Sequence, residues 1–155
     1  MLKPLIVIAI LIILVLSTSQ LIVGWLSFTR LISTKGNLQH PPNIGVYEDN
    51  NCTIPLSYIN WGSLEPGMAR NTTMYIRNDG SEKLELQVDA MNWQPANISN
   101  YMNLTWNYKG EAVFPNETVK VTLTLSSSSS PAFTEYLVAH DVKEFSFDII
   151  ISAFG

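Results

Sequence analysis

The chain has 155 residues and a formal net charge of −4, which leaves room for one domain and an appendage. Its charges are uneven, because three of the nine Lys and Arg residues precede residue 36 and all thirteen Asp and Glu residues follow it. The acidic part beyond residue 36 argues against nucleic acid as a partner. A single cysteine, Cys52, excludes both an internal disulfide and zinc-finger spacing.

The chain begins with an apolar segment. From Leu5 to Phe28, sixteen of twenty-four residues are Leu, Ile, Val or Phe, and none is charged. As a helix this segment would extend roughly 36 Å, against about 30 Å for the hydrocarbon core of a bilayer. We therefore expect residues 1–32 to form a transmembrane or signal-anchor helix, with the membrane as one partner of the chain.

A polar patch of Ser17, Thr18, Ser19 and Gln20 interrupts this segment. A signal peptidase cutting after Ser19 would leave a mature chain that begins with a β-forming, apolar stretch, which must be buried, for example as an added strand in a neighbour's sheet. Without cleavage, the same patch would offer hydrogen bonds to another helix in the membrane. The apolar run resumes at once after Gln20, which favours retention.

Five Asn-x-Ser/Thr sequons indicate on which side of the membrane the rest of the chain lies. Chance would give about two in a chain of this composition. We expect an extracytoplasmic, cell-surface domain that is glycosylated; a generic Asn/Thr-rich β-protein is the alternative. The candidate glycosylation sites are Asn51, Asn71, Asn97, Asn103 and Asn116.

Residues 33–43 are polar and contain the pair Pro41-Pro42, so we expect a short stiff spacer with no central strand. Beyond it, alternation with period two predicts a mainly β domain over residues 44–155. About seven strands are expected, a number typical of an immunoglobulin-like antiparallel β-sandwich. The runs are 44–48, 53–61, 71–78, 84–93, 101–108, 118–125 and 143–154.

The turn "NDG" at 78–80 separates two of these runs, and Met74 and Ile76 before it alternate in the same way as Leu84 and Leu86 after it. This pattern is typical of a β-hairpin with one half-buried face. We therefore predict that residues 71–78 and 84–93 pair directly.

The stretch "INWGSLEPGMARNTTMYIRNDGSEKLELQVDAMNW" resembles the front half of PapD-like immunoglobulin sandwiches. Together with the apolar N-terminus and the sequons, it is also similar to archaeal cell-surface proteins, including type IV pilin-like subunits and donor-strand-complemented fibres. These resemblances imply a structural surface subunit. The chain departs from a pilin precursor at the start, where only Met1, Leu2 and Lys3 precede Pro4.

Two further features are open to more than one interpretation. Residues 126–141 combine a serine tract with the apolar "AFTEYLV". They could form a partner-facing flap, but a loop with one helical turn or a short edge strand that covers the core is favoured. We expect the lone thiol of Cys52 to be buried, because an exposed free thiol outside the cell would be a liability.

Few residues could support chemistry. The two histidines, His40 and His140, lie far apart in the chain, and His140-Asp141 lacks the further ligands of a metal-dependent hydrolase. The cluster "YEDNNCT" at 47–53 offers oxygen donors for calcium, but such clusters also form ordinary turns. Trp61, Trp93 and Trp106 are expected in packing rather than in a sugar platform.

We therefore expect no enzyme and no cofactor. The favoured function is that of a structural surface protein, anchored in the membrane or assembled into a pilus-like filament through its apolar N-terminal segment. The alternative is a membrane-tethered accessory module that holds a partner protein or glycan beside the membrane.

Overall fold

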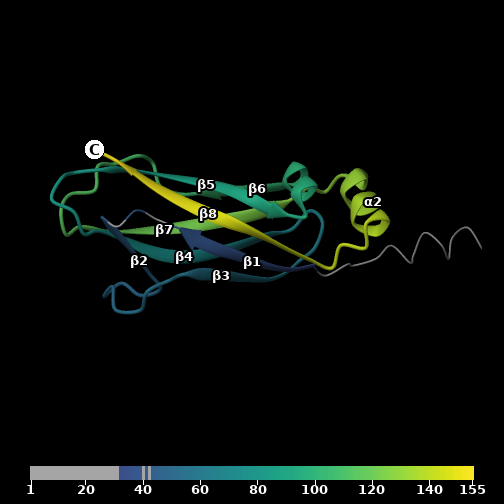
Figure 1. Ribbon diagram of the computed structural model, residues 1–155, viewed down its shortest axis with the longest axis horizontal. Helices are drawn as coiled ribbons and strands as arrows, with labels where there is room; N and C mark the ends of the chain where they lie inside the picture. Colours follow the sequence, from purple (N-terminus) through teal and green to yellow (C-terminus); the bar gives the residue numbers. More distant parts are fainter. Residues whose placement is uncertain (1–31, 40, 42) are drawn as a thin grey trace, which may run out of the picture.

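Two four-stranded β-sheets pack face to face around one apolar core in the computed structural model, which describes residues 32–155 apart from 40 and 42 (Figure 1). We name the sheet with strand order β3-β1-β8-β5 sheet A and the sheet with order β2-β4-β7-β6 sheet B. The elements are β1 (Ile32–Gln39), β2 (Ile44–Tyr47), β3 (Tyr58–Leu64), β4 (Ala69–Asn78), β5 (Glu85–Gln94), the 3-10 helix η1 (Ala96–Tyr101), β6 (Met102–Trp106), β7 (Thr118–Ser127), the α-helix α2 (Pro131–Ala139) and β8 (Glu144–Phe154).

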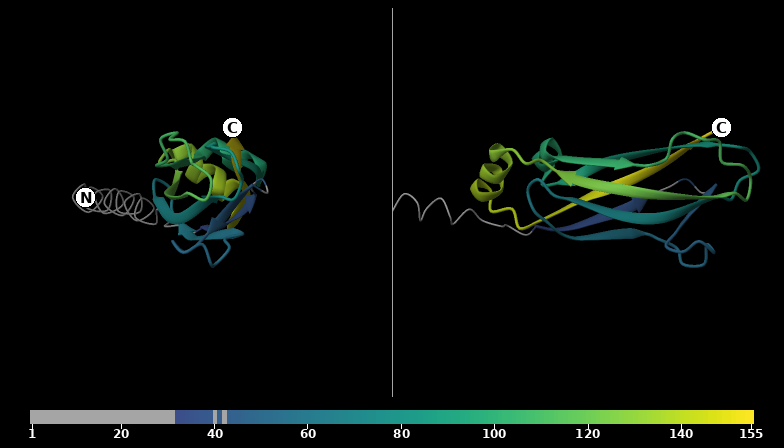
Figure 2. Two further views of the ribbon diagram at one scale, coloured as in Figure 1. Left: turned by 90° about the vertical axis from the view of Figure 1, so that its left-hand side faces the viewer. Right: turned by 180° about the vertical axis from the view of Figure 1, so that it is seen from behind.

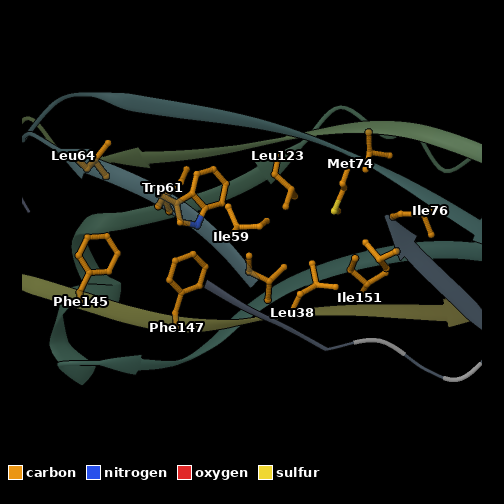
Figure 3. Close-up of a cluster of buried hydrophobic side chains, with 14 of the residues drawn as sticks. Leu38, Ile59, Trp61, Leu64, Met74, Ile76, Leu123, Phe145, Phe147 and Ile151 are labelled. Atoms are coloured by element: carbon orange, nitrogen blue, oxygen red, sulfur yellow. The ribbon is translucent and has the colours of Figure 1, made fainter. Parts of the chain in front are cut away.

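The core follows from alternation along the strands. In β8 the side chains of Phe145, Phe147, Ile149 and Ile151 are all buried, and the residues between them are more exposed. Strands of sheet B supply the facing layer, which includes Met74, Ile76 and Leu123 (Figure 3). The mainly β class and the two-sheet architecture predicted from the sequence are confirmed, with eight strands in the described chain rather than about seven.

The prediction of a spacer over residues 33–43 is wrong for most of its length. Residues 32–39 form β1, which is a central strand of sheet A, parallel to β8 and antiparallel to β3. Its residues are buried and exposed in strict alternation. The pair Pro41-Pro42 follows the strand instead of preventing it, because proline restricts only its own backbone and that of the residue before it.

The hairpin prediction is also wrong, because β4 and β5 lie in different sheets. Asn78 is fully buried where the chain crosses between the sheets, and its Nδ2 donates to the carbonyls of Glu82 (2.8 Å) and Val113 (3.0 Å). Its Oδ1 accepts from the amide of Gly80 at 2.9 Å. Alternation correctly showed which side chains face the core, but it does not specify the partner strand.

Helix α2 covers one end of the sandwich, so the covering interpretation of residues 126–141 is confirmed and the element is a helix of nine residues. Ser130 is its N-cap, with its hydroxyl accepting from the amide of Phe133, and Pro131 opens the first turn. Phe133 and Leu137, four residues apart, are both buried, and Phe133 stacks on Tyr101 of η1 with 5.0 Å between ring centroids.

The two ends of the sandwich are distinct, and this polarity matters for function. Strands β1 and β8 are parallel, and both begin at the end that carries α2 (Figures 1 and 2). The last residues of β8 lie at the opposite end, beyond the end of β1. The chain that precedes Ile32 is therefore joined to the sandwich at the α2 end.

Candidate functional site

All five sequon asparagines have exposed side chains. Asn51 lies in the connection between β2 and β3, Asn97 in η1, and Asn116 in the connection before β7, where its backbone has a positive φ of 64°. Asn71 and Asn103 lie within strands β4 and β6 of sheet B. A glycosyltransferase needs access to the amide nitrogen, and each of these positions gives it.

The sequons in β4 and β6 share one surface. Because residues two apart in a strand point to the same side, Asn71 and the Thr73 of its sequon both lie on the outer face of sheet B. Asn103 and Thr105 do the same on β6, and both strands flank β7. The face between them is rich in hydroxyl groups, with the Oγ1 atoms of Thr73 and Thr122 3.4 Å apart. The four strands of sheet A contain no sequon.

In the candidate calcium loop, residues 47–53, the carboxylate of Asp49 is hydrogen-bonded to neighbouring residues of the chain. The side chain of Asp49 accepts from the amides of Thr53 (2.9 Å) and Ile54 (2.8 Å) and from the hydroxyl of Thr53 (2.8 Å). Desolvation raises the pKa of Asp49, but these hydrogen bonds outweigh it and leave the pKa below its ordinary value. This is turn chemistry, and the described residues contain no group of three or more His, Cys, Asp or Glu side chains that could hold a metal.

Cys52 lies at the tip of the same loop and is half-buried, so the expectation of a buried thiol is not met. Its backbone has a positive φ of 54°, and its Sγ lies 3.5 Å from the Oγ1 of Thr118. The turn that Asp49 closes places Cys52 at the surface of the domain. Other residues therefore pack against only one side of its side chain.

His140 directly follows α2 and is exposed. Its Nδ1 lies 3.0 Å from the carbonyl oxygen of Tyr136, and the two rings are tilted by 33° with 4.6 Å between centroids. Asp141 forms an ion pair with Lys143 at 2.8 Å. His140 is thus placed as a helix-terminal residue. His40 lies outside the described residues, as do Ser17, Thr18, Ser19 and Gln20.

The three tryptophans come from both sheets and pack on different neighbours. Trp61 of β3 is buried in the core, Trp93 of β5 stacks on Phe147 with 4.1 Å between ring centroids, and Trp106 of β6 lies against Tyr108. These contacts confirm the packing interpretation. They place no common aromatic surface that could bind a sugar ring.

The environment of β1 is a feature that the sequence analysis missed. Its core-facing residues are Ile32, Thr34, Gly36 and Leu38. Thr34 is 1% exposed, and its hydroxyl has no hydrogen-bond partner among the described residues; the same holds for the indole N–H of the buried Trp61. Each such group costs about 1–3 kcal/mol. The sequence signal for this strand is the alternation of its side chains. It is hard to recognise because two of the core-facing residues, Thr34 and Gly36, are not large and apolar.

Position 36 of β1 is closely packed. A Cβ there would lie 2.8 Å from Cδ1 of Ile149 and 3.2 Å from Nε1 of Trp61, so a side chain at this position would require the end of Ile149 to shift. Figure 3 shows Trp61 and Phe147 within the same buried cluster as Leu38. Strand β1, between β3 and β8, thus has a glycine at its centre, with Thr34 and Leu38 two positions away on either side.

A groove lies beyond the end of β1, at the end of the sandwich opposite α2. The last pair between β1 and β8 is Gln39 with Ile150, so on this side Ile151–Phe154 pairs with no described strand. A cavity of about 390 Å³ lies there, lined by Gln39, Pro41 and residues 150–153. Its floor is the continuing strand β8.

Among the described residues, no helix is long and apolar enough to cross a bilayer. The predicted membrane helix of residues 1–32 lies almost wholly outside the described residues. Comparison with models of known protein families finds no match, and comparison with curated protein sequences finds none either. Function is therefore inferred from the chain and its geometry.

Proposed function

We propose that the chain is an extracytoplasmic structural protein of the cell surface, held at the membrane or assembled into a filament through its apolar N-terminal segment. The observation that carries this proposal is the placement of the sequons. All five asparagines are exposed, whereas Asn78, the one buried asparagine among the described residues, is not part of a sequon. A glycosylation machinery acting outside the cytoplasm would find each site open.

The distribution of the sequons adds a second argument. A face that carries glycans is poorly suited to close packing, and a face free of them remains available for contacts with other proteins. In this chain the outer face of sheet B carries Asn71 and Asn103, and the strands of sheet A carry none. We propose that sheet B faces the medium and that sheet A lies on the side used in assembly.

The immunoglobulin-like description and the resemblance to archaeal surface subunits belong to this proposal. Two stacked sheets with mostly antiparallel pairing support the description. The last two strands, β7 and β8, lie in different sheets, however, unlike the final strands of that fold. The functional proposal rests on the sequons and the apolar segment and does not depend on the fold name.

The intact mass of the protein isolated from its own cells tests the proposal. We expect masses above that of the polypeptide and the loss of one glycan unit with each of Asn71→Gln and Asn103→Gln. Asn100→Gln, an exposed asparagine without a sequon, is the matched control and should leave the mass distribution unchanged apart from the substitution. Unmodified protein that is also protected from protease added to intact cells would refute the proposal.

A membrane-tethered accessory module is the second candidate, and one groove favours it. A cavity of about 410 Å³ lies on the outer face of sheet A near the α2 end, and its lining includes Lys35, Gln94 and Glu144 beside Phe145. Such a set of donors and acceptors suits a glycan or a peptide. Extraction by detergent only in a stable complex with other proteins, with no filaments on the cell surface, would favour this function over the structural one.

A further inference from the structure

Phe114 is an exposed aromatic residue beside a sequon. Its side chain is 58% exposed, and its ring lies outside the buried core and outside the aromatic pairs of the described residues. Two residues later comes Asn116, the asparagine of the sequon that Thr118 completes. Among the described aromatic residues that are more than half exposed, Tyr58, Phe114 and Phe154, only Phe114 lies in the same turn as a sequon.

The backbone holds Asn116 next to Phe114 in a tight turn. The amide of Glu117 donates to the carbonyl oxygen of Phe114 at 2.9 Å, and Pro115 and Asn116 lie between them. Pro115 requires a negative φ, whereas Asn116 has a φ of 64°, and this combination is that of a type II turn. Asparagine tolerates the left-handed conformation better than most residues. The turn therefore favours at position 116 the same residue type that N-glycosylation uses.

Further hydrogen bonds hold this turn in place. The carboxylate of Glu117 accepts from the amide of Phe114 at 2.8 Å. The amide of Asn116 donates to the carbonyl oxygen of Asn78 at 2.9 Å, and the amide of Asn78 donates to the carbonyl oxygen of Glu117 at 3.0 Å. The turn is thus tied to the end of β4. The positions of Phe114 and Asn116 relative to each other are therefore fixed by the protein before any sugar is added.

We propose that Asn116 is glycosylated and that the ring of Phe114 packs against the apolar face of the first sugar. A pyranose ring presents one face made mostly of C–H groups, and a phenyl ring can cover that face and remove it from water. This inference rests on the proposed function, because it needs Asn116 to meet a glycosylation machinery outside the cytoplasm. It adds to that function the protein surface that binds the sugar.

The attachment is a glycosyl transfer from a lipid-linked sugar phosphate. A bond forms between Nδ2 of Asn116 and C1 of the sugar, while the bond between C1 and the phosphate oxygen breaks. The lipid phosphate leaves with the electron pair of that bond, and Nδ2 loses one proton to solvent. The product is a neutral secondary amide, so no oxidant or reductant is needed.

The other sequons lack this arrangement. Asn103 also follows an aromatic residue by two positions, but that residue, Tyr101, already packs on Phe133 and Tyr136, with 5.0 and 5.3 Å between ring centroids. The residues two positions before the remaining three sequon asparagines are not aromatic.

The turn lies where β7 begins, at the end of the sandwich opposite α2 (Figure 1). The first sugar on Asn116 would therefore be held at the end away from the point where the chain enters β1.

A double-mutant cycle on the full chain, isolated from its own cells and unfolded by urea in detergent, tests the contact. Thr118→Val removes the sequon but keeps Asn116, which suits the turn, and Phe114→Ser removes the ring. Burial of roughly 40 Å² of ring face corresponds to about a fivefold change in the folding equilibrium constant. We expect Thr118→Val to lower this constant about fivefold more in the native background than in the Phe114→Ser background.

Three variants are matched controls. Thr118→Ser keeps the sequon and should keep the glycan, and Phe114→Tyr keeps the ring and should retain the fivefold coupling. Asn97→Gln removes a sequon at the α2 end, and its coupling to Phe114→Ser should stay below about twofold. Occupancy is read from the mass of the tryptic peptide 110–120, in which Asn116 is the only sequon asparagine.

An unmodified peptide 110–120, or a coupling between Thr118→Val and Phe114→Ser below about twofold, would overturn the inference. If Asn71 and Asn103 carry glycans in that case, the proposed function stands and only the inference fails. A chain that carries no glycan at any sequon and is protected from protease added to intact cells would refute both.

Discussion

Thr34→Val should stabilise the protein, although it changes a residue in the centre of a sheet. Thr34 is 1% exposed, and its hydroxyl has no hydrogen-bond partner among the described residues. Valine has nearly the same shape and removes the cost of an unpaired buried hydroxyl, which is about 1–3 kcal/mol. Val is also well suited to a buried strand. We take the lower end of that range and expect a gain of about 1 kcal/mol in the free energy of unfolding, or about 3–5 °C in Tm for a domain of this size.

The assay is thermal and chemical unfolding of the full chain in detergent, followed by circular dichroism. Thr124→Val, half-buried on the outer face of sheet B, is the matched control and should change the free energy of unfolding by less than about 0.5 kcal/mol. An unchanged or lowered Tm for Thr34→Val would show that the hydroxyl has a partner in solution and would refute this reasoning.

Three further predictions concern the frame of the sandwich. Phe133→Ala removes the buried anchor of α2 and should cost about 3–5 kcal/mol, whereas Val138→Ala, at an exposed position on the same helix, should cost less than about 0.5 kcal/mol; both are measured by urea unfolding. Asn78→Ala removes the side-chain donor to the carbonyl of Glu82, one of the two donors to the carbonyl of Val113 and the acceptor of the Gly80 amide; it should cost about 2–3 kcal/mol in the same assay, and a loss below 0.5 kcal/mol would contradict its role at the crossover. The pKa of Asp49 is lowered in the folded state, so its contribution is present above the ordinary value of 3.8 and is lost as pH falls through the folded pKa; amide exchange at Ile54 should therefore rise in acid in the native chain and show no such step in Asp49→Asn.

Alternation predicts the burial of side chains well and the pairing of strands poorly. Met74, Ile76 and Leu86 were correctly predicted to share the buried faces of their strands, because a period of two needs only local information. The pairing of β4 with β7, and of β5 with β8, depends on contacts between distant parts of the chain. The turn at residues 78–80 suggested a hairpin, and the buried amide of Asn78 instead supports a crossover between the sheets.

Strand β1 was not predicted from the sequence for a different reason. Its core-facing Gly36 fits the core because Ile149 and Trp61 fill the space that a side chain at position 36 would take. That complementarity exists only in the folded sheet, so the local sequence resembles a linker. The sequons, in contrast, could be judged partly from the local sequence. Their exposure could be expected from the residue types alone, but the concentration of two of them on sheet B and the absence of any from sheet A required the strand order.

The central claim is that the sandwich lies outside the cytoplasm, and labelling of intact cells with a membrane-impermeant maleimide tests it most directly. Ser81→Cys in a Cys52→Ser background places the only thiol of the chain at an exposed turn between β4 and β5. The account predicts that this thiol is labelled as fully in intact cells as after lysis. Labelling that appears only after lysis would contradict the account.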